Sequence, residues 1–286
     1  MPQSRIVYLN GEFLPLAEAR IPIMDRGFLF ADGIYEVSAV LDGRLVDNEA
    51  HLARLDRSLG EIDIRNPHTT KEWIGLQTDL IARNGLEEGL VYMQVTRGVA
   101  ERDFAYPSAD TTPTVMMFTQ GKRIAANPLA ETGAKVVTVP DLRWKRRDIK
   151  SVALLAQVLA KQQAAAAGVA EAWMVEDGAV TEGSSSTAFI VTASGVLVTR
   201  PLSTALLPGI TRKAVLRLAE EADLTIEERL FSVEEACAAT EAFYTSASAF
   251  VMPVVALDGK VIGDGSPGPL TRRLRAHYLA LARGEG

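Results

Sequence analysis

The chain has 286 residues, of which 48% are hydrophobic and 23% are charged, enough for one large core or two ordinary domains. Its 36 acidic side chains outnumber the 30 lysines and arginines, so the formal net charge is −6. This balance argues against a nucleic-acid partner, because such proteins need surplus cations to neutralise phosphates. Small anionic ligands are compatible with it, since a few arginines suffice to bind them.

The scarcity of cysteine and histidine excludes several kinds of site. A single cysteine, Cys237, rules out an intrachain disulfide and a multi-cysteine metal site, and three scattered histidines argue against a metal centre. The start of the chain has no apolar signal stretch, and no apolar run reaches the ~20 residues of a membrane span. We expect a cytoplasmic protein with no membrane partner and no metal. Any catalysis would use Lys, Arg, Glu, Tyr or Ser, or an organic cofactor.

The first half predicts an α+β domain with a largely antiparallel sheet. Asn10-Gly11 and Asp42-Gly43 stand between apolar alternating segments, as in two-residue hairpin turns. Helical spacing of leucines predicts a helix over 49–59, and a second helix is predicted over 70–83. VYMQVTRG and TPTVMMFTQ predict neighbouring strands that are separated by a loop over 99–112.

The second half predicts short strands and helices after a linker. We assign residues 1–120 to an N-terminal domain, 121–133 to the linker and 134–286 to a larger C-terminal domain. After the strand AKVVTV, a helix is predicted over 151–167. The strands EAWMVED, GAVTEG, STAFIVT and GVLVTR follow, then a helix from near Gly209, the strands EAFYTSAS and MPVVALDGKVI, and a terminal helix containing TRRLRAHYLALA.

The segment RWKRRDIK ends at a candidate nucleophile, Lys150. Four cations precede it: Arg143, Lys145, Arg146 and Arg147. Their charge, together with apolar surroundings, would disfavour a protonated Lys150. Attack on an aldehyde requires the neutral amine, so Lys150 is a candidate Schiff-base lysine. Taken alone, the segment favours a solvated basic run with an ordinary lysine at a helix start.

Glu182, in TEGSSSTAFIV, stands at the entrance to an apolar strand. A carboxylate is costly to bury there without a cationic partner, and the protonated nitrogen of a pyridine ring would be such a partner. Ser184, Ser185 and Ser186 can donate hydrogen bonds to an anion or hold the turn. The alternative for this segment is a tight turn with an exposed Glu182.

Two segments carry candidate phosphate partners. In LLPGITRKAV, Gly209 precedes a predicted helix whose first free N–H groups belong to Ile210 and Thr211. A helix N-terminus offers donors and a positive dipole end to phosphate. Arg54, in HLARLDRS, is a second candidate, with Arg57 as its competitor. In isolation, a helix cap and an exposed helical arginine are the commoner explanations.

The glycine-rich stretch MDRGFLFADGIYEV lacks the G-x-G-x-x-G spacing, so it does not predict a dinucleotide-binding fold. It places three aromatic side chains around a tight backbone, Phe28, Phe30 and Tyr35. Tyr35 is therefore a candidate pocket residue, and a core tyrosine is the alternative.

In chain order, DRGFLFADGIYEV, HLARL, DIKSVALLAQVLAK, TEGSSSTAF, PGITR and YTSAS resemble the fold type IV family of pyridoxal-phosphate enzymes. This family includes D-amino-acid transaminases, branched-chain aminotransferases and aminodeoxychorismate lyases. The motifs of this chain are most similar in sequence to those of D-amino-acid transaminases. The resemblance implies a two-domain α+β or α/β fold and pyridoxal 5′-phosphate as cofactor. It also implies a homodimer whose site lies at the subunit interface, with both domains of a subunit enclosing the cofactor.

The resemblance also assigns roles by motif. Lys150 matches the Schiff-base lysine, and Glu182 matches the carboxylate beside the pyridine nitrogen. The implied phosphate partners are Arg54, Ile210, Thr211, Ser246 and Ala247. The implied substrate contacts are Tyr35, Arg102 and Phe104. Of these, Arg102 matches an arginine that binds the substrate carboxylate, whereas Arg97, in VTRG, is predicted to be structural.

The function implied is transamination between D-amino acids, such as D-alanine and D-glutamate, and 2-oxoglutarate or pyruvate. Lys150 would move a proton from the substrate Cα to the cofactor, first as base and then as acid. Two residues depart from the family pattern. Ala31 replaces a usual glycine, and Phe104 stands where D-amino-acid members tend to carry histidine.

The alternatives follow from these departures and from the shared fold. Phe104 in place of histidine removes one hydrogen-bond donor to a substrate carboxylate and adds apolar surface. This favours an (R)-selective amine transaminase as the first alternative. The others are a branched-chain L-amino-acid aminotransferase, a lyase, which rests only on the shared fold, and a non-catalytic binding protein. The simultaneous presence of Lys150, Glu182 and Arg54 argues against the last.

Overall fold

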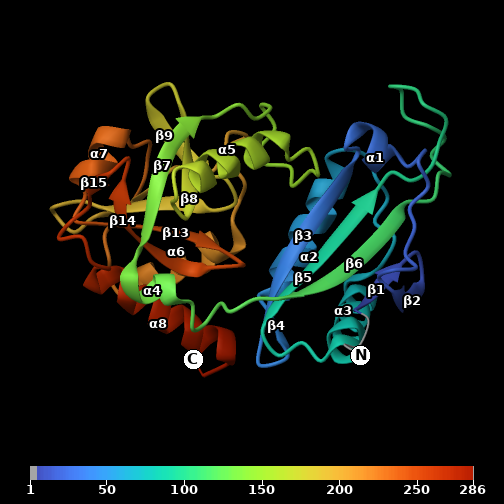
Figure 1. Cartoon of the computed structure of the whole chain (residues 1–286), viewed down its shortest axis with the longest axis horizontal. Helices are drawn as coiled ribbons and strands as arrows, with labels where there is room; N and C mark the ends of the chain where they lie inside the picture. The colour runs from blue at the N-terminus through green and yellow to red at the C-terminus, as the bar shows by residue number, and fades with distance from the viewer. Residues whose placement is uncertain (1–4, 286) are drawn as a thin grey trace. The chain divides into compact units, whose positions relative to one another are not determined.

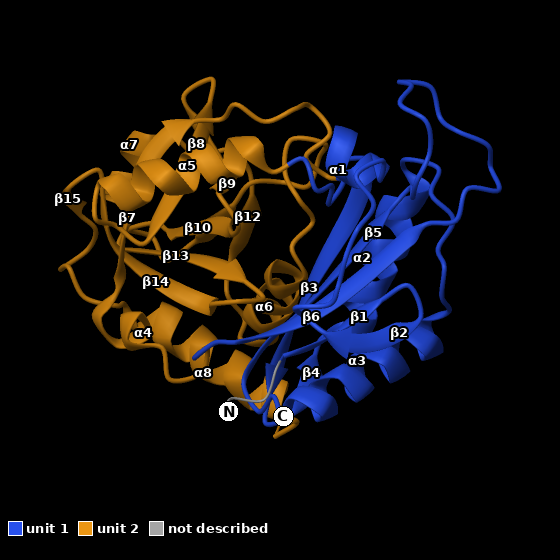
Figure 2. Ribbon diagram, turned by 45° about the vertical axis from the view of Figure 1, so that its right-hand side comes forward, with its two compact units in different colours: residues 1–123, 149–153 blue, residues 124–148, 154–286 orange. Residues whose placement is uncertain are grey.

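The computed structural model describes residues 5–285 and divides into two compact units (Figure 2). Unit 1 comprises Met1–Arg123 and Ile149–Ala153, and unit 2 comprises Ile124–Asp148 and Leu154–Gly286. Each unit has its own sheet and its own buried apolar cluster. The domain boundaries drawn from the sequence stay a prediction, but the short segment around Lys150 belongs to unit 1 by its contacts.

Unit 1 is built on an antiparallel sheet with the strand order β2-β1-β6-β5-β3-β4 (Figure 1). Its strands are β1 (Ile6–Leu9), β2 (Glu12–Pro15), β3 (Gly33–Leu41), β4 (Arg44–Val46), β5 (Gly89–Thr96) and β6 (Thr114–Gly121). Asn10, Gly11, Asp42 and Gly43 all have positive φ, so both predicted hairpin turns are confirmed.

Three helices belong to unit 1: α1 (Arg26–Phe30), α2 (Asn48–Gly60) and α3 (Thr70–Asn84). Helices α2 and α3 confirm the two predicted helices. Leu52, Leu55 and Leu59 are buried in one cluster with alternate residues of the central strands. The other face of β3, β5 and β6 carries a row of stacked rings, Tyr35, Tyr92 and Phe118.

Unit 2 is built on a mixed sheet with the order β12-β11-β10-β13-β14-β7-β8-β9, and β15 pairs with β14. Its strands are β7 (Ala134–Pro140), β8 (Glu171–Glu176), β9 (Ala179–Gly183), β10 (Thr187–Val191), β11 (Leu197–Thr199), β12 (Ile226–Glu228), β13 (Glu241–Ser246), β14 (Phe250–Leu257) and β15 (Lys260–Val261). Its helices are α4 (Pro128–Thr132), α5 (Leu155–Ala166), α6 (Ile210–Glu221), α7 (Val233–Ala238) and α8 (Pro269–Arg283).

One predicted helix begins in the wrong place. The sequence predicts a helix from residue 151, whereas α5 begins at Leu155. The backbone before it is extended, because Ser151 bridges Ile34 and the Val152 N–H donates to the Gly33 carbonyl at 3.0 Å. Three short helices, α1, α4 and α7, were not predicted, and α4 lies inside the predicted linker.

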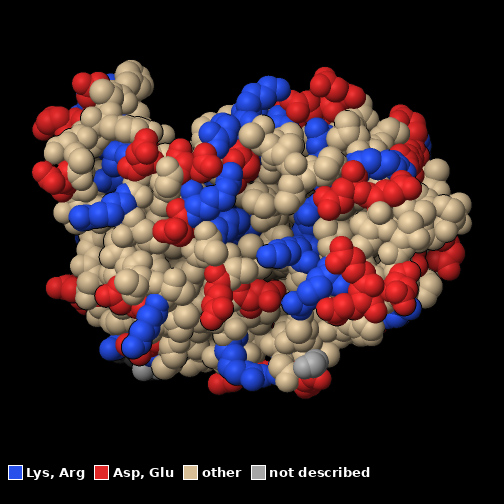
Figure 3. All heavy atoms as spheres, turned by 180° about the vertical axis from the view of Figure 1, so that it is seen from behind, with Lys and Arg blue, Asp and Glu red and all other residues tan. Residues whose placement is uncertain are grey.

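The surface mixes charges of both signs. On the face shown in Figure 3, lysines and arginines alternate with aspartates and glutamates rather than forming a field of one sign. Among residues 5–285, no helix combines the length and the apolar character that crossing a membrane would require.

Candidate active site

Lys150 is held by backbone pairing with β3. The Tyr35 N–H donates to the Lys150 carbonyl at 3.0 Å, and the Lys150 N–H donates to Ser58 Oγ at 3.4 Å. Gly33 permits the close approach of β3 to β5, since a Cβ at that position would lie 2.8 Å from the Val95 carbonyl oxygen. Long-range pairing therefore positions Lys150, which is not at a helix start.

The Lys150 side chain lies over the ring of Tyr35. Its Nζ is 4.2 Å from the ring centroid, a cation–π distance. Tyr35 in turn stacks on Tyr92 with centroids 5.6 Å apart, and Tyr92 stacks on Phe118 at 4.8 Å. The structure thus brings together two residues that the sequence singled out separately, and rings on neighbouring strands support them.

The four cations before Lys150 are each paired with carboxylates. The ion pairs are Arg143 with Asp141 and Glu182, Arg147 with Asp141 and Glu176, Lys145 with Glu176, and Arg146 with Asp148. Their positive charge is neutralised locally. Their effect on Lys150 stays a prediction.

Arg54 is part of a buried ion pair that the sequence did not predict. Its Nε donates to Glu36 Oε1 at 2.6 Å and its Nη2 to Glu36 Oε2 at 2.9 Å, while His51 Nδ1 lies 2.8 Å from Oε2. Burial alone would raise the pKa of Glu36, but the charge and hydrogen bonds of Arg54, aided by His51, hold it well below its usual range. Only the position of Glu36 in an apolar strand hinted at this role.

Glu182 is buried, so the alternative of an exposed turn residue is wrong. Arg143 Nη1 donates to its Oε1, and the Leu207 N–H donates to both carboxylate oxygens at 3.2 and 3.3 Å. Arg143 is shared with Asp141, to which it donates at 2.9 and 2.7 Å. Burial raises the pKa of Glu182 above its ordinary value, although Arg143 and the Leu207 N–H oppose this. The sequence indicated that burying Glu182 is costly, but it did not identify Arg143 as its partner.

The serines after Glu182 mainly hold the turn. Ser184 and Ser186 both donate to the buried carboxylate of Glu171, the latter at 3.1 Å. A Cβ at Gly183 would collide with Ser186 Oγ, so a larger residue there would have to displace the Ser186 hydroxyl. Of the two roles that the sequence left open for these serines, the structure shows turn-holding for Ser184 and Ser186, while Ser185 is exposed. Glu171 was missed.

The start of α6 offers uncapped N–H groups. Its N-cap is Gly209, which makes no side-chain cap hydrogen bond, and the next residues are Ile210 and Thr211. A Cβ at Gly209 would lie 2.9 Å from Thr187 Oγ1. Thr187 faces Thr245 across the β10–β13 pair, and Thr245 Oγ1 is buried with no hydrogen-bond partner within residues 5–285.

The turn after β13 carries Ser246 and Ala247. Ser246 Oγ lies 3.4 Å from Ser248 Oγ. Arg275, a buried residue of α8, donates to the carbonyls of Ala249 and Val251 at 2.9 and 2.8 Å. These bonds fix the backbone that follows the turn, and the sequence contained no signal for them.

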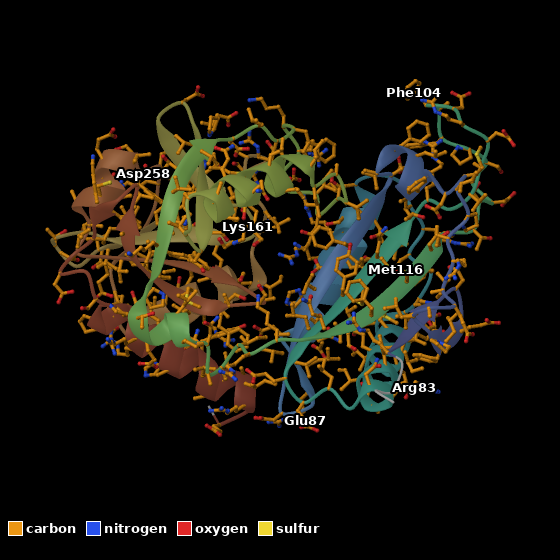
Figure 4. The ribbon with its side chains drawn as sticks, in the orientation of Figure 1. Arg83, Glu87, Phe104, Met116, Lys161 and Asp258 are labelled. Carbon is orange, nitrogen blue, oxygen red and sulfur yellow. The ribbon has the colours of Figure 1, made fainter. Side chains whose placement is uncertain are left out.

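Arg102 lies in the long loop between β5 and β6, and Figure 4 labels Phe104 at the tip of this loop. The Arg102 guanidinium carbon is 5.3 Å from the ring centroid of Phe30 and 5.5 Å from that of Phe104. The two rings are 5.5 Å apart, and Phe104 is 79% exposed. Phe104 therefore forms an apolar wall beside an exposed cation.

Ala31 explains why glycine is usual at its position. It ends α1 with a φ of 56°, in the left-handed region where glycine has no Cβ penalty. The alanine keeps the turn at a cost of about 1–2 kcal/mol.

Comparison with known proteins identifies the family. The family described as amino-transferase class IV matches residues 33–257. A D-alanine aminotransferase of Staphylococcus aureus is 40% identical over 272 residues, 95% of this chain and 96% of the relative. Another, from Bacillus licheniformis, is 40% identical over 269 residues, 94% of each chain.

Solved structures share the fold. A branched-chain amino acid aminotransferase from T.th., solved with pyridoxamine 5′-phosphate, has a TM-score of 0.89 at 24% identity and covers 99% of this chain and 96% of its own. The enzyme from Thermoproteus uzoniensis, solved with norvaline, has a TM-score of 0.87 at 26% identity with the same coverage. The chain belongs to the class IV aminotransferases, the fold type IV family that its motifs resemble, and it is a pyridoxal-phosphate-dependent transaminase.

The residues present fit this cofactor. Glu182 has a raised pKa and shares its arginine, so a cationic ring nitrogen would complete its surroundings. The unpartnered hydroxyl of Thr245 and the uncapped start of α6 match the acceptor-rich chemistry of a phosphate. Lys150, in unit 1, carries a primary amine, the group that a Schiff-base link to this cofactor would need.

Proposed function

We propose that this chain transfers amino groups between D-amino acids and 2-keto acids, with D-alanine and D-glutamate among the donors and pyruvate and 2-oxoglutarate among the acceptors. The observation that carries the proposal is 40% identity over 95% of the chain with a D-alanine aminotransferase. The position of Lys150 over Tyr35 supports it, because the amine is held on an aromatic surface by fixed backbone.

In this proposal the chain's residues divide the work. Pyridoxal phosphate, when bound, supplies an aldehyde that condenses with amines and a ring that accepts electrons from the substrate Cα. Lys150 moves the Cα proton as base and then as acid. Glu182 keeps a proton on the ring nitrogen. The phosphate partners are Arg54, Ile210, Thr211, Ser246 and Ala247, and the substrate contacts are Tyr35, Arg102 and Phe104.

Lys150→Ala tests the catalytic assignment. We expect the rate of D-alanine turnover to fall by about 10²–10⁴-fold, the usual contribution of a positioned acid–base group, and the visible absorbance of the lysine-bound cofactor to disappear. Lys71→Ala, on the exposed surface of α3, is the matched control and keeps both. A wild-type rate in Lys150→Ala would refute the assignment.

A substrate panel tests the specificity. We expect conversion of D-alanine and not L-alanine when 2-oxoglutarate or pyruvate is the acceptor. Full activity on L-leucine without activity on D-alanine would replace the proposal with a branched-chain specificity.

The apolar wall at Phe104 favours one second candidate, an (R)-selective amine transaminase. The rings of Phe30 and Phe104 both lie beside Arg102, so an apolar group can lie where a carboxylate would. Faster turnover of (R)-1-phenylethylamine than of D-alanine would select this function. Phe104→His should then move the preference toward D-amino acids, since it restores a carboxylate donor.

We also propose that the chain forms a homodimer. Helix α5 exposes three apolar side chains at helical spacing: Leu155 at 72%, Val158 at 58% and Leu159 at 48%. Such a stripe is typical of a subunit interface. Sedimentation should show a dimer that Leu155→Glu with Val158→Glu converts to monomer, and a wild-type monomer at micromolar concentration would refute the proposal. The location in the cytoplasm stays a prediction.

A further inference from the structure

The loop that carries Arg102 has little structure of its own. Its few local hydrogen bonds include the Ala105 N–H to Asp103 Oδ1 at 3.1 Å and the Thr111 N–H to the Ser108 carbonyl at 3.0 Å. Within the described part of the chain, Arg102 makes ring contacts but no hydrogen bond or ion pair. Something outside the loop must therefore set the position of this guanidinium.

A buried cluster at the base of the loop meets this need. Asp32 accepts from Arg26 Nε at 2.8 Å, and from Arg97 Nε and Nη2 at 2.7 and 3.0 Å. The three side chains are only 11%, 4% and 8% exposed, respectively. Charge-assisted contacts this well shielded from water have fixed directions. We call Asp32, Arg26 and Arg97 the Asp32 cluster.

The Asp32 cluster contacts the loop at two points that follow Arg102 in the chain. Arg26 Nη1 donates to the Asp103 carbonyl at 2.6 Å, directly beside Arg102. The Arg97 guanidinium lies 3.6 Å from the ring centroid of Tyr106, further along the loop. Arg97 also donates to the Ile62 and Asp63 carbonyls, which ties the Asp32 cluster to the turn that follows α2.

Phe30 joins the same arrangement from α1. The Arg26 guanidinium lies 4.8 Å from its ring centroid, and Arg102 and Phe104 contact the same ring. One phenylalanine is therefore shared by the arginine that holds the loop and the arginine that the loop presents. Moving Arg26 would shift the backbone beside Arg102 and the ring against which Arg102 rests.

We propose that Arg26 and Arg97 are positioning residues for substrate carboxylate recognition. They hold the loop through Asp103 and Tyr106, so that the Arg102 guanidinium is fixed before a substrate arrives. Neither residue is assigned a contact with substrate or cofactor. The inference deepens the proposed function and rests on it, because it takes Arg102 as the carboxylate-binding residue. A misplacement of about 1 Å at such a group can cost up to about 100-fold in efficiency.

A double-mutant cycle on the holoenzyme tests the inference. Arg26→Met removes the bond to Asp103 and leaves Asp32 paired with Arg97. We expect the KM for D-alanine and the inhibition constant of propionate, a carboxylate without an amine, to rise about 10–100-fold while kcat changes less than about 3-fold. In an Arg102→Ala background the same change should have almost no further effect, because Arg26 acts through Arg102.

Two more variants complete the test. Arg20→Met, in the same segment, is the matched control and should behave as wild type, because within residues 5–285 Arg20 bonds only the nearby Ala17 and Ala19 carbonyls. Tyr106→Ala removes the stack on Arg97 without disturbing the buried pair, so it keeps the inference testable if Arg26→Met unfolds. We expect it to weaken propionate binding by about 3–10-fold with kcat preserved.

The outcomes separate the inference from the proposed function. If Arg102→Ala leaves propionate binding and the KM for D-alanine unchanged, the carboxylate role in the proposed function is wrong. If Arg102→Ala weakens both while Arg26→Met and Tyr106→Ala do not, only the positioning role is overturned. Equal losses from Arg26→Met in the presence and absence of Arg102 would also overturn it, because they indicate a general structural effect.

Discussion

Each unit buries a glutamate against an arginine, and the two pairs differ in the direction of the glutamate's pKa. Glu36 has Arg54 on both oxygens and His51 on one, and these contacts hold its pKa well below the usual range. For Glu182, burial prevails and the pKa is raised. The immediate cause is the supply of cations, since both side chains are almost inaccessible to water.

Sharing of the arginine explains the difference. Burial would raise the pKa of Asp141, but its hydrogen bonds and attraction to Arg143, with a contribution from Thr181, lower it. Glu182 therefore receives only part of one guanidinium, whereas Glu36 has a bidentate arginine. A carboxylate with a complete set of partners stabilises a fold, and one with an incomplete set retains affinity for another cation. This contrast assigns a structural role to Glu36 and favours a cofactor role for Glu182.

Removing the charge of Glu36 should give the largest change. Glu36→Gln leaves Arg54 buried without its carboxylate partner, and we expect the free energy of unfolding of the cofactor-free protein to fall by about 3–5 kcal/mol. Urea denaturation of the cofactor-free protein measures this. A loss below about 1 kcal/mol would mean that Glu36 is not the main partner of Arg54.

Glu182→Gln should lower the catalytic rate more than the stability. We expect kcat to fall by about 10²–10³-fold, the usual size for one lost electrostatic contact to charge that develops during reaction. The free energy of unfolding should change less than in Glu36→Gln, because Arg143 keeps Asp141. Steady-state kinetics and urea denaturation of the same preparations check both. A large stability loss with normal kcat would remove the distinction between the pairs.

The pH dependence of stability should separate the pairs by sign. Because the pKa of Glu36 is lowered on folding, its stabilisation is present above its unfolded pKa of about 4.3 and is lost as the pH falls toward its folded pKa. The pKa of Glu182 is raised, so its protonation favours folding, and its contribution is lost as the pH rises through the folded pKa. Glu36→Gln should therefore flatten the loss of stability below about pH 4.5, and Glu182→Gln should not. A steep acid limb in Glu36→Gln would contradict this assignment.

An exposed pair gives the smallest expected effect. Arg57 Nη2 lies 3.4 Å from Glu61 Oε1 with both side chains accessible to water. Glu61→Gln should change the free energy of unfolding by about 0.5 kcal/mol or less. It also serves as the control for the loss of a glutamate charge, and a change near that of Glu36→Gln would show that burial does not set the scale.

Local patterns predicted most of the elements. The Asn-Gly and Asp-Gly turns were predictable because these residue types tolerate positive φ. Helix α2 was predictable because its leucines recur at helical spacing. The predicted start of α5 was wrong because the Lys150 carbonyl and the Val152 N–H pair with β3, more than a hundred positions earlier. Short helices such as α1 were missed because five residues do not establish a periodic pattern.

Partners of charged residues were harder to predict. The sequence pointed to Lys150, Glu182 and Arg54, but not to Arg143 as the cation beside Glu182 or to Glu36 as the carboxylate beside Arg54. Arg97 was predicted to be structural, and its bonds to Asp32 agree with that. Such pairings join residues far apart in the chain, and no spacing rule connects them.

The sequence by itself determined the family, the cofactor class and the kinds of side chain available, because the order of the motifs and the chemistry of each residue can be identified from the sequence alone. The tertiary structure decided which carboxylate receives which arginine, that Lys150 lies on an extended segment over Tyr35, and that the Asp32 cluster holds the loop of Arg102. The physical reason is that burial and charge pairing depend on distances between segments, and folding alone sets those distances.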